Sequence, residues 1–191
     1  ELASNGIISE QQYQTKLVEP FPGATGNESP YDTSLALSPD QQHLYIAISQ
    51  RSSVPYGGII SHFSRDPATG NLTYADQLDY TQPNLEGFRE FQSLRVSPDG
   101  KFLYAAANTY STSGPSVPGT IYIFSISAGG SLTLTERYQL DDPSETLLQI
   151  YWPSAIEFSK NGKLAYVTDQ VNNALLQFSR NETTGSLSFL G

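Results

Sequence analysis

The chain holds 191 residues with a mass of 20.9 kDa, of which 38% are hydrophobic and only 15% are charged. This balance excludes a charge-rich disordered chain and leaves enough apolar residues for a core. Nineteen acidic against ten basic residues give a net charge of -9, which argues against binding to a nucleic-acid duplex. Without cysteine there is no disulfide, thiolate metal site or cysteine nucleophile, and no apolar stretch approaches the roughly 18 residues of a membrane span.

The first segment, residues 1–34, is predicted to hold the outer strand of an incomplete repeat, followed by a loop. Residues 6–9 (GIIS) read like residues 70–73 (GNLT), which close a later repeat. The chain starts with Glu1 rather than Met, so we expect a processed or excised piece from which any signal peptide has been removed.

Similar segments then recur at intervals of about 60 residues. In the first set an apolar strand and a polar turn lead to Tyr45, Tyr104 and Tyr166, which are 59 and 62 residues apart. A second set shares a Phe-Ser pair and a glycine-containing turn. The first set comprises residues 35–45, 94–104 and 156–166, and the second comprises residues 62–72, 123–132 and 177–187. The chain therefore contains three full repeats.

Each repeat is predicted to form four antiparallel strands, because apolar residues alternate with a period of two. In the middle repeat, residues 94–96, 102–107, 120–127 and 132–140 are the expected strands, and Ser-Pro-Asp-Gly at 97–100 is a tight turn. Four such strands describe one blade of a β-propeller. The expected fold is all-β, with blades at residues 35–80, 81–140 and 141–191, the last strand being truncated.

Three blades do not close a ring, because propellers usually contain four to eight. The remaining blades are expected to come from a longer polypeptide, from a partner chain or from further copies of this chain. A dimer with a six-bladed ring is one of these alternatives.

The two turn motifs, SPDGKFLY at 97–104 and FSRDPATGNLT at 63–73, resemble the repeats of the lactonase-type seven-bladed propellers. That group includes 6-phosphogluconolactonases and carboxymuconate cyclases, so the resemblance implies a lactonase or a cycloisomerase. It also implies a Pro-Arg-His segment where an inner strand begins. The equivalent segments, 29–33, 89–93 and 152–154, lack this run, so no catalytic residue is assigned.

Long, dissimilar loops are expected at one end of the blades, and such loops often carry binding sites. Five residues in or beside them are candidate ligands of a small polar or sugar-like molecule: Asp32, Arg89, Glu90, Trp152 and Asp169. The alternative is an ion pair between Arg89 and Glu90 beside packed phenylalanines. Acid–base chemistry by Glu86 and Glu90 would require burial to raise one pKa.

The sequence predicts no metal site and no cofactor. The acidic run at 141–145 lacks the regular alternation of a calcium loop and is interpreted as a solvated turn. His43 is expected to be exposed in a tight turn and His62 to pack within a strand, too far apart for a catalytic triad or a zinc site. No glycine-rich phosphate loop is present.

Three glycosylation sequons begin at Asn27, Asn71 and Asn181, and they favour an extracellular, secreted protein. The main functional hypothesis is a non-enzymatic module that binds a protein or a glycan, or assembles, through its long-loop end. The alternative is a lactonase or cycloisomerase acting on a sugar lactone or a carboxylated ring. Neither hypothesis involves nucleic acid or a membrane span.

Overall fold

The computed structural model describes residues 33–50, 57–79, 82, 85, 90–109, 117–139 and 150–191. These residues form twelve β-strands and no helix. The strands are β1 (Thr33–Leu37), β2 (His43–Gln50), β3 (Gly57–Arg65), β4 (Leu72–Asp79), β5 (Phe91–Val96), β6 (Phe102–Thr109), β7 (Val117–Ile126), β8 (Leu132–Tyr138), β9 (Pro153–Phe158), β10 (Leu164–Asp169), β11 (Ala174–Arg180) and β12 (Leu187–Phe189). None of the described segments is a helix able to cross a membrane.

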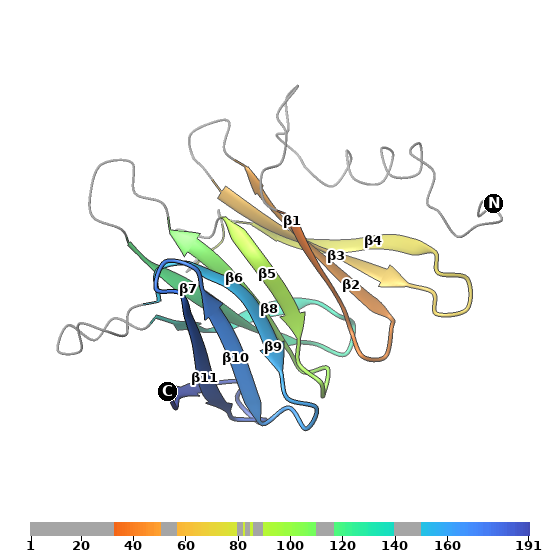
Figure 1. Cartoon of the computed structure of the whole chain (residues 1–191). Coiled ribbons are helices and arrows are strands. Elements are labelled where there is room, and N and C mark those ends of the chain that lie inside the picture. Colours follow the sequence, from red (N-terminus) through yellow and green to blue (C-terminus); the bar gives the residue numbers. More distant parts are fainter. Residues whose placement is uncertain are drawn as a thin grey trace.

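The strands form three four-stranded antiparallel sheets, each made of strands consecutive in sequence. We call them blade I (β1–β4), blade II (β5–β8) and blade III (β9–β12). Figure 1 shows the three sheets as successive blades of a partial propeller. This confirms the predicted all-β fold.

The turn chemistry of the sequence explains why the first two strands of each blade reverse so tightly. In blade II, Asp99 accepts hydrogen bonds from the Ser97 hydroxyl and the Lys101 amide, and Gly100 adopts a φ of 72°. Blade I has Gln41 at the position of Gly100, with a φ of 62°. A residue with a Cβ is strained in this left-handed region, so Gln41 is less favourable at this turn position than the glycine of blade II.

The first strands of the blades lie at the inside of the arc. Strand β5 contacts both β1 and β9, whereas the fourth strands of adjacent blades share no comparable contact among the described residues. Hydrogen bonds also join the inner strands, since the Leu94 amide donates to Ser34 Oγ and the Ile156 amide donates to Ser93 Oγ. Residues that precede β5 and β9 therefore lie near the axis of the propeller.

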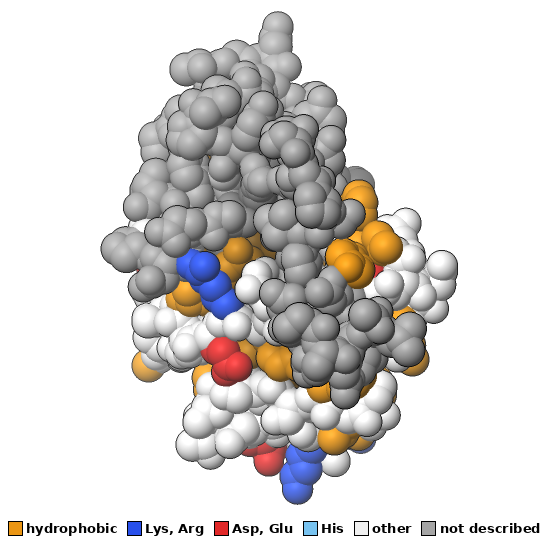
Figure 2. Space-filling model, turned by 90° about the vertical axis from the view of Figure 1, so that its left-hand side faces the viewer, with side chains coloured by type: hydrophobic (Ala, Val, Ile, Leu, Met, Phe, Trp, Pro, Cys, Tyr) orange, Lys and Arg blue, Asp and Glu red, His pale blue; other side chains and the backbone are white. Residues whose placement is uncertain are grey.

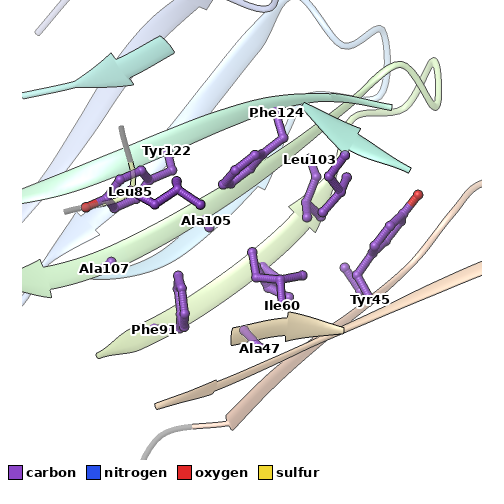
Figure 3. Close-up of a cluster of buried hydrophobic side chains, with 13 residues drawn as sticks. Tyr45, Ala47, Ile60, Leu85, Phe91, Leu103, Ala105, Ala107, Tyr122 and Phe124 are labelled. Carbon is purple, nitrogen blue, oxygen red and sulfur yellow. The ribbon is translucent and has the colours of Figure 1, made fainter. Parts of the chain in front are cut away.

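The hydrophobic core lies between the blades, in two layers that we call seam I–II and seam II–III. Figure 3 shows seam I–II, where Tyr45 and Ile60 of blade I face Leu103 and Phe124 of blade II. Seam II–III is built in the same way, around Phe102, Tyr104, Ile123, Ile156 and Phe178. Burying a side chain of this size contributes about 1.5–3 kcal/mol, so the seams hold the blades together.

Some strand boundaries differ from the prediction. Strand β5 begins at Phe91 rather than Leu94, because a bulge between Phe91 and Ser93 lets the pairing with β6 continue. Strand β7 begins at Val117 rather than Thr120. The outer strand predicted within residues 1–34 lies outside the described residues, and Thr33 and Ser34, predicted as loop, belong to β1.

The blades have two distinct ends. The turns that join β1 to β2 and β3 to β4, with their equivalents, lie at one end, which we call the turn end. The opposite end, where β2, β6 and β10 finish, is the loop end. In Figure 2 the described surface on one side of the molecule shows hydrophobic and uncharged polar side chains with few charged ones, in keeping with the low charge content.

Candidate functional site

Three of the five candidate ligand residues are described, and all three lie at the loop end. Glu90 directly precedes β5, Trp152 directly precedes β9, and Asp169 is the last residue of β10. Because β5 and β9 are neighbouring inner strands, Glu90 and Trp152 lie at adjacent positions around the axis. The other two candidates, Asp32 and Arg89, lie outside the described residues.

Asp169 organises the loop end of blade III. Its carboxylate is buried and accepts hydrogen bonds from the backbone amides of Tyr151, Trp152, Val171 and Asn172 at 2.9–3.3 Å. The Asn172 side chain donates a fifth hydrogen bond at 2.9 Å. These donors come from both sides of the carboxylate in sequence, so Asp169 joins the entry to β9 with the turn that follows β10. Its role in the geometry is to position Trp152.

Trp152 offers an aromatic surface at this end. Its side chain is 39% exposed. Its backbone is fixed at both polar groups, because the amide donates to Asp169 and the carbonyl accepts from Gln170 at 3.0 Å. An exposed indole on a fixed backbone is suited to stacking on an apolar face of a sugar-like ring.

Glu90 is a second buried acidic residue of the loop end, in addition to Asp169. It is only 5% exposed and has a φ of 53°, which is unusual for a residue with a side chain. Its carbonyl accepts a hydrogen bond from the Asn108 amide at 3.1 Å, which ties the start of β5 to the end of β6. Backbone strain of this kind costs about 1–3 kcal/mol and often occurs at functional sites.

Asn108 is a site residue that the sequence did not reveal. It lies near the end of β6 and is 4% exposed, and neither its side-chain oxygen nor its nitrogen has a hydrogen-bond partner among the described residues. A buried amide without partners costs about 1–3 kcal/mol per unsatisfied group, so such a residue calls for an explanation. The only sequence signal was a polar residue after three alanines of an inner blade strand.

The two histidines are close together, contrary to the prediction. His43 does not lie exposed in the turn; it opens β2, is half-buried, and its Nδ1 lies 3.1 Å from Nε2 of His62. The reason is the register, which pairs Tyr45 with His62 and so places both histidines on the face toward blade II. His62 is buried, as predicted, and its Nδ1 lies 3.2 Å from Asp76. Burial lowers the pKa of His62.

These histidines belong to seam I–II at the turn end, far along the strands from Glu90 and Trp152. A Cβ at Gly130 of blade II would overlap both imidazole rings, so the rings pack directly on that turn. Asp76 also accepts a hydrogen bond from the Ser131 hydroxyl of blade II. Within the described ranges no group of three His, Asp or Glu side chains has a geometry that could hold a metal ion. Glu86 and the acidic run at 141–145 lie outside those ranges.

Two of the three sequons are described, and both lie in exposed turns at the turn end. Asn71 follows the β3–β4 turn of blade I, and Asn181 opens the equivalent turn of blade III. The Asn181 side chain accepts hydrogen bonds from the amides of Thr183 and Thr184. Asn27 lies outside the described residues. Glycosylation at these positions stays a prediction.

Comparison with known proteins places this geometry in a family. A family model described as lactonase, seven-bladed β-propeller, matches residues 34–191. Proteins named 6-phosphogluconolactonase from two strains of Klebsiella pneumoniae are each 31% identical over 112 residues, which make up 59% of this chain and 29% of theirs. From these two shares, the chain spans about half the length of the curated relatives it matches.

Solved structures show the same fold. A protein from Lactobacillus plantarum superimposes with a TM-score of 0.60 at 23% identity, covering 82% of this chain and 40% of that protein. A candidate 6-phosphogluconolactonase from Bacteroides fragilis superimposes with a TM-score of 0.61 at 20% identity, covering 87% of this chain and 39% of that protein. At these identities the likeness establishes the blade architecture and nothing about the chemistry.

Proposed function

Because this chain belongs to the lactonase family of seven-bladed β-propellers, we propose that the propeller of which it forms a part hydrolyses the lactone of a sugar acid. The curated relatives named 6-phosphogluconolactonase support this choice. The same findings favour the enzymatic hypothesis over the non-enzymatic binding module. The single observation in the structure that carries the proposal is the buried, strained Glu90 beside the Asn108 side-chain amide, which has no partner in the described part of the chain.

The reaction adds water to the lactone carbonyl and breaks the ring C–O bond, which yields a carboxylate and an alcohol. A carboxylate next to the substrate can accept the proton of the attacking water or bind the sugar hydroxyls. In our proposal Glu90 fills this role, and the Asn108 amide donates to and accepts from polar groups of the ring. Trp152 stacks on the face of the sugar, held in place by Asp169.

The negative net charge of the chain favours a neutral lactone substrate over a phosphorylated one. A net charge of -9 repels anions at a distance, so it disfavours a phosphorylated lactone compared with a neutral one. We therefore expect glucono-1,5-lactone to be hydrolysed at least as efficiently as its 6-phosphate.

The test is acid release in a pH-stat, with both lactones as substrates and the spontaneous rate subtracted. Glu90→Gln is expected to lower kcat/KM by about 100-fold or more, the usual contribution of a general acid–base group. Glu157→Gln is the matched control, because Glu157 lies near the turn end of β9, in an exposed pair with Arg95. A protein that is no faster than buffer would refute the function, and an active Glu90→Gln variant would remove Glu90 from the site.

A further inference from the structure

Each blade has a polar residue four positions after the recurrent tyrosine of its second strand: Ser49, Asn108 and Gln170. The backbone confirms that the last two places are equivalent. The Asn108 backbone amide donates to the carbonyl of Glu90 at 3.1 Å, and the Gln170 backbone amide donates to the carbonyl of Trp152 at 3.0 Å. Both bonds join the loop end of the second strand to the residue that precedes the inner strand. The side chains at this place can therefore be compared from blade to blade.

In blade I the side chain at this place links two blades. Ser49 is 1% exposed, and its hydroxyl accepts a hydrogen bond at 2.9 Å from the backbone amide of Phe91, the first residue of β5 in blade II. The bond satisfies a buried serine and a buried backbone amide together. A polar side chain at this place thus serves to hold the inner strand of the next blade.

The equivalent bond cannot form between blade II and blade III. Pro153 opens β9 as Phe91 opens β5, and each pairs with the residue directly before the polar place in its own second strand. Proline has no backbone N–H, so the donor that Ser49 uses has no counterpart for Asn108. This accounts for a buried Asn108 side chain that has no partner among the described residues.

The backbone of β6 is also irregular at Asn108. The pairing of β6 with β7 shifts its register between Ala107 and Thr109, whereas β2 pairs with β3 without a shift as far as Gln50. A bulge changes the direction of a side chain, and bulges are frequent next to active sites. Blade II therefore differs from blade I in two ways at this place, since one change removes the donor and the other re-aims the side chain.

We propose that Asn108 is the specificity residue of the lactone site, and that its side-chain amide binds hydroxyl groups of the sugar ring; this inference rests on the proposed function. Its oxygen accepts hydrogen bonds and its NH2 group donates them. Neighbouring hydroxyls of a sugar lactone both donate and accept, so they satisfy both atoms. The two oxygens of a lactone without hydroxyls only accept, so they leave the Asn108 oxygen unpaired.

The burial of Asn108 makes this choice between substrates effective. A buried group that only the hydroxylated substrate satisfies discriminates strongly against an analogue that lacks the hydroxyls. The free protein carries the cost of the unpaired amide, and bound substrate relieves it. Leucine has a similar size and no polar atoms. Asn108→Leu should therefore weaken the preference for a sugar lactone while it stabilises the fold.

The test compares hydrolysis of glucono-1,5-lactone with that of δ-valerolactone, which has the same ring without hydroxyls. Asn108→Leu is expected to lower kcat/KM for glucono-1,5-lactone by about tenfold or more, the loss of one or two neutral hydrogen bonds, and to hydrolyse δ-valerolactone like the wild type. The ratio of the two kcat/KM values cancels any general loss of activity. Glu157→Gln, in its exposed pair with Arg95, is again the control and is expected to keep the wild-type ratio.

Urea unfolding separates this role from a structural one. Asn108→Leu removes buried polar atoms that are unpaired in the described part of the fold, so its unfolding midpoint is expected to move to a higher urea concentration. Ser49→Ala removes an acceptor at the equivalent place that the fold uses, so its midpoint is expected to move to a lower concentration.

The outcomes distinguish this inference from the proposed function. An equal loss of activity towards both lactones in Asn108→Leu, an unchanged ratio, or a lower unfolding midpoint would overturn the specificity role and leave the proposed function standing. A wild-type protein that hydrolyses neither lactone faster than buffer would overturn the proposed function and this inference with it.

Discussion

Replacing Arg180 by methionine is the most direct test of how the blades are held together. Methionine keeps most of the apolar stem and removes the guanidinium, which makes four hydrogen bonds to Tyr104, Gly162 and Asp99. Breaking a buried ion pair from one side typically costs about 3–5 kcal/mol. The Asp99 side chain is 26% exposed and keeps its bonds from Ser97 and Lys101, so water relieves part of this cost. We expect a loss of about 3 kcal/mol.

The assay is urea unfolding followed by the fluorescence of Trp152, the only tryptophan of the chain. Arg95→Met is the control. Arg95 also joins β5 to β9, through Glu157 and the Ile156 carbonyl, but it does so at the surface, where both side chains of the ion pair are about half exposed or more. Exposed pairs contribute about 0–1 kcal/mol, so this variant is expected to unfold nearly like the wild type. Equal destabilisation by the two variants would refute the claim that Arg180 locks seam II–III.

Acidity provides a second readout of the same contact. Burial raises the pKa of Asp99, but the hydrogen bonds from Ser97 and Arg180 outweigh it and hold the pKa below its ordinary 3.8. A carboxyl with a depressed pKa in the fold stabilises the fold above about pH 4, and this contribution is lost as the pH falls further. In the Arg180→Met variant, the free energy of unfolding is expected to fall less steeply as the pH is lowered below about 4.

Three further predictions concern single positions. Burial lowers the pKa of His62, so the unfolded chain binds the proton more readily, and the free energy of unfolding is expected to fall as the pH drops below 6.5. His62→Gln is expected to reduce the difference in this free energy between urea titrations at pH 7.5 and 5.5. The close ring of His43 adds to the effect, and an unchanged slope in the variant would contradict it. Gln41→Gly relieves a left-handed backbone and is expected to raise the free energy of unfolding by up to about 1 kcal/mol; a loss of stability would show that the Gln41 side chain matters. Asp169→Ala removes five accepted hydrogen bonds and is expected to shift the emission of Trp152 to longer wavelength in the native state, whereas an unchanged spectrum would mean that the loop is held by other contacts.

The strands and turns were predictable from the sequence because their causes are local. Alternating apolar residues define a strand with one or both faces buried, and Ser-Pro-Asp-Gly at 97–100 specifies its own reversal through Asp99 and Gly100. The recurrence of Tyr45, Tyr104 and Tyr166 then set the period of the blades. Where boundaries were missed, as at Phe91, a bulge extended the pairing in a way that periodicity does not reveal.

The contacts between blades were not predictable in the same way, because the hydrogen bonds described above join residues 42 to 81 positions apart. Arg180 and Asp99 belong to different repeats, and nothing in either repeat alone reveals that one carries the partner of the other. A signal was present, since the Phe-Ser-Arg motif recurs at Arg65 and Arg180. The middle repeat obscures it, because Ile126 takes the place of the arginine and seam I–II relies on His43 and His62 instead.

The candidate site was predictable in part. Glu90 and Trp152 could be placed because residues that enter an inner strand lie near the axis of any propeller. Asn108 was missed because a polar residue after Ala-Ala-Ala reads as the end of an apolar strand. Only the structure shows that both atoms of its amide lack partners among the residues it describes. Asp169 was named as a ligand candidate, and its five donors are visible only once the turn after β10 is folded.

The turn end and the loop end of the blades differ in how well their buried polar groups are satisfied. At the turn end, polar groups such as the Tyr104 hydroxyl and the Arg180 guanidinium are buried and hydrogen-bonded across a seam. At the loop end, Glu90 has a strained backbone, and the Asn108 side-chain amide has no partner within the described ranges. Strain and unsatisfied polar groups are tolerated where function requires them and where the rest of the fold supplies the stability to hold them. The hydrogen-bonded seams at the turn end would therefore give the loop end the rigidity that the proposed lactone site requires.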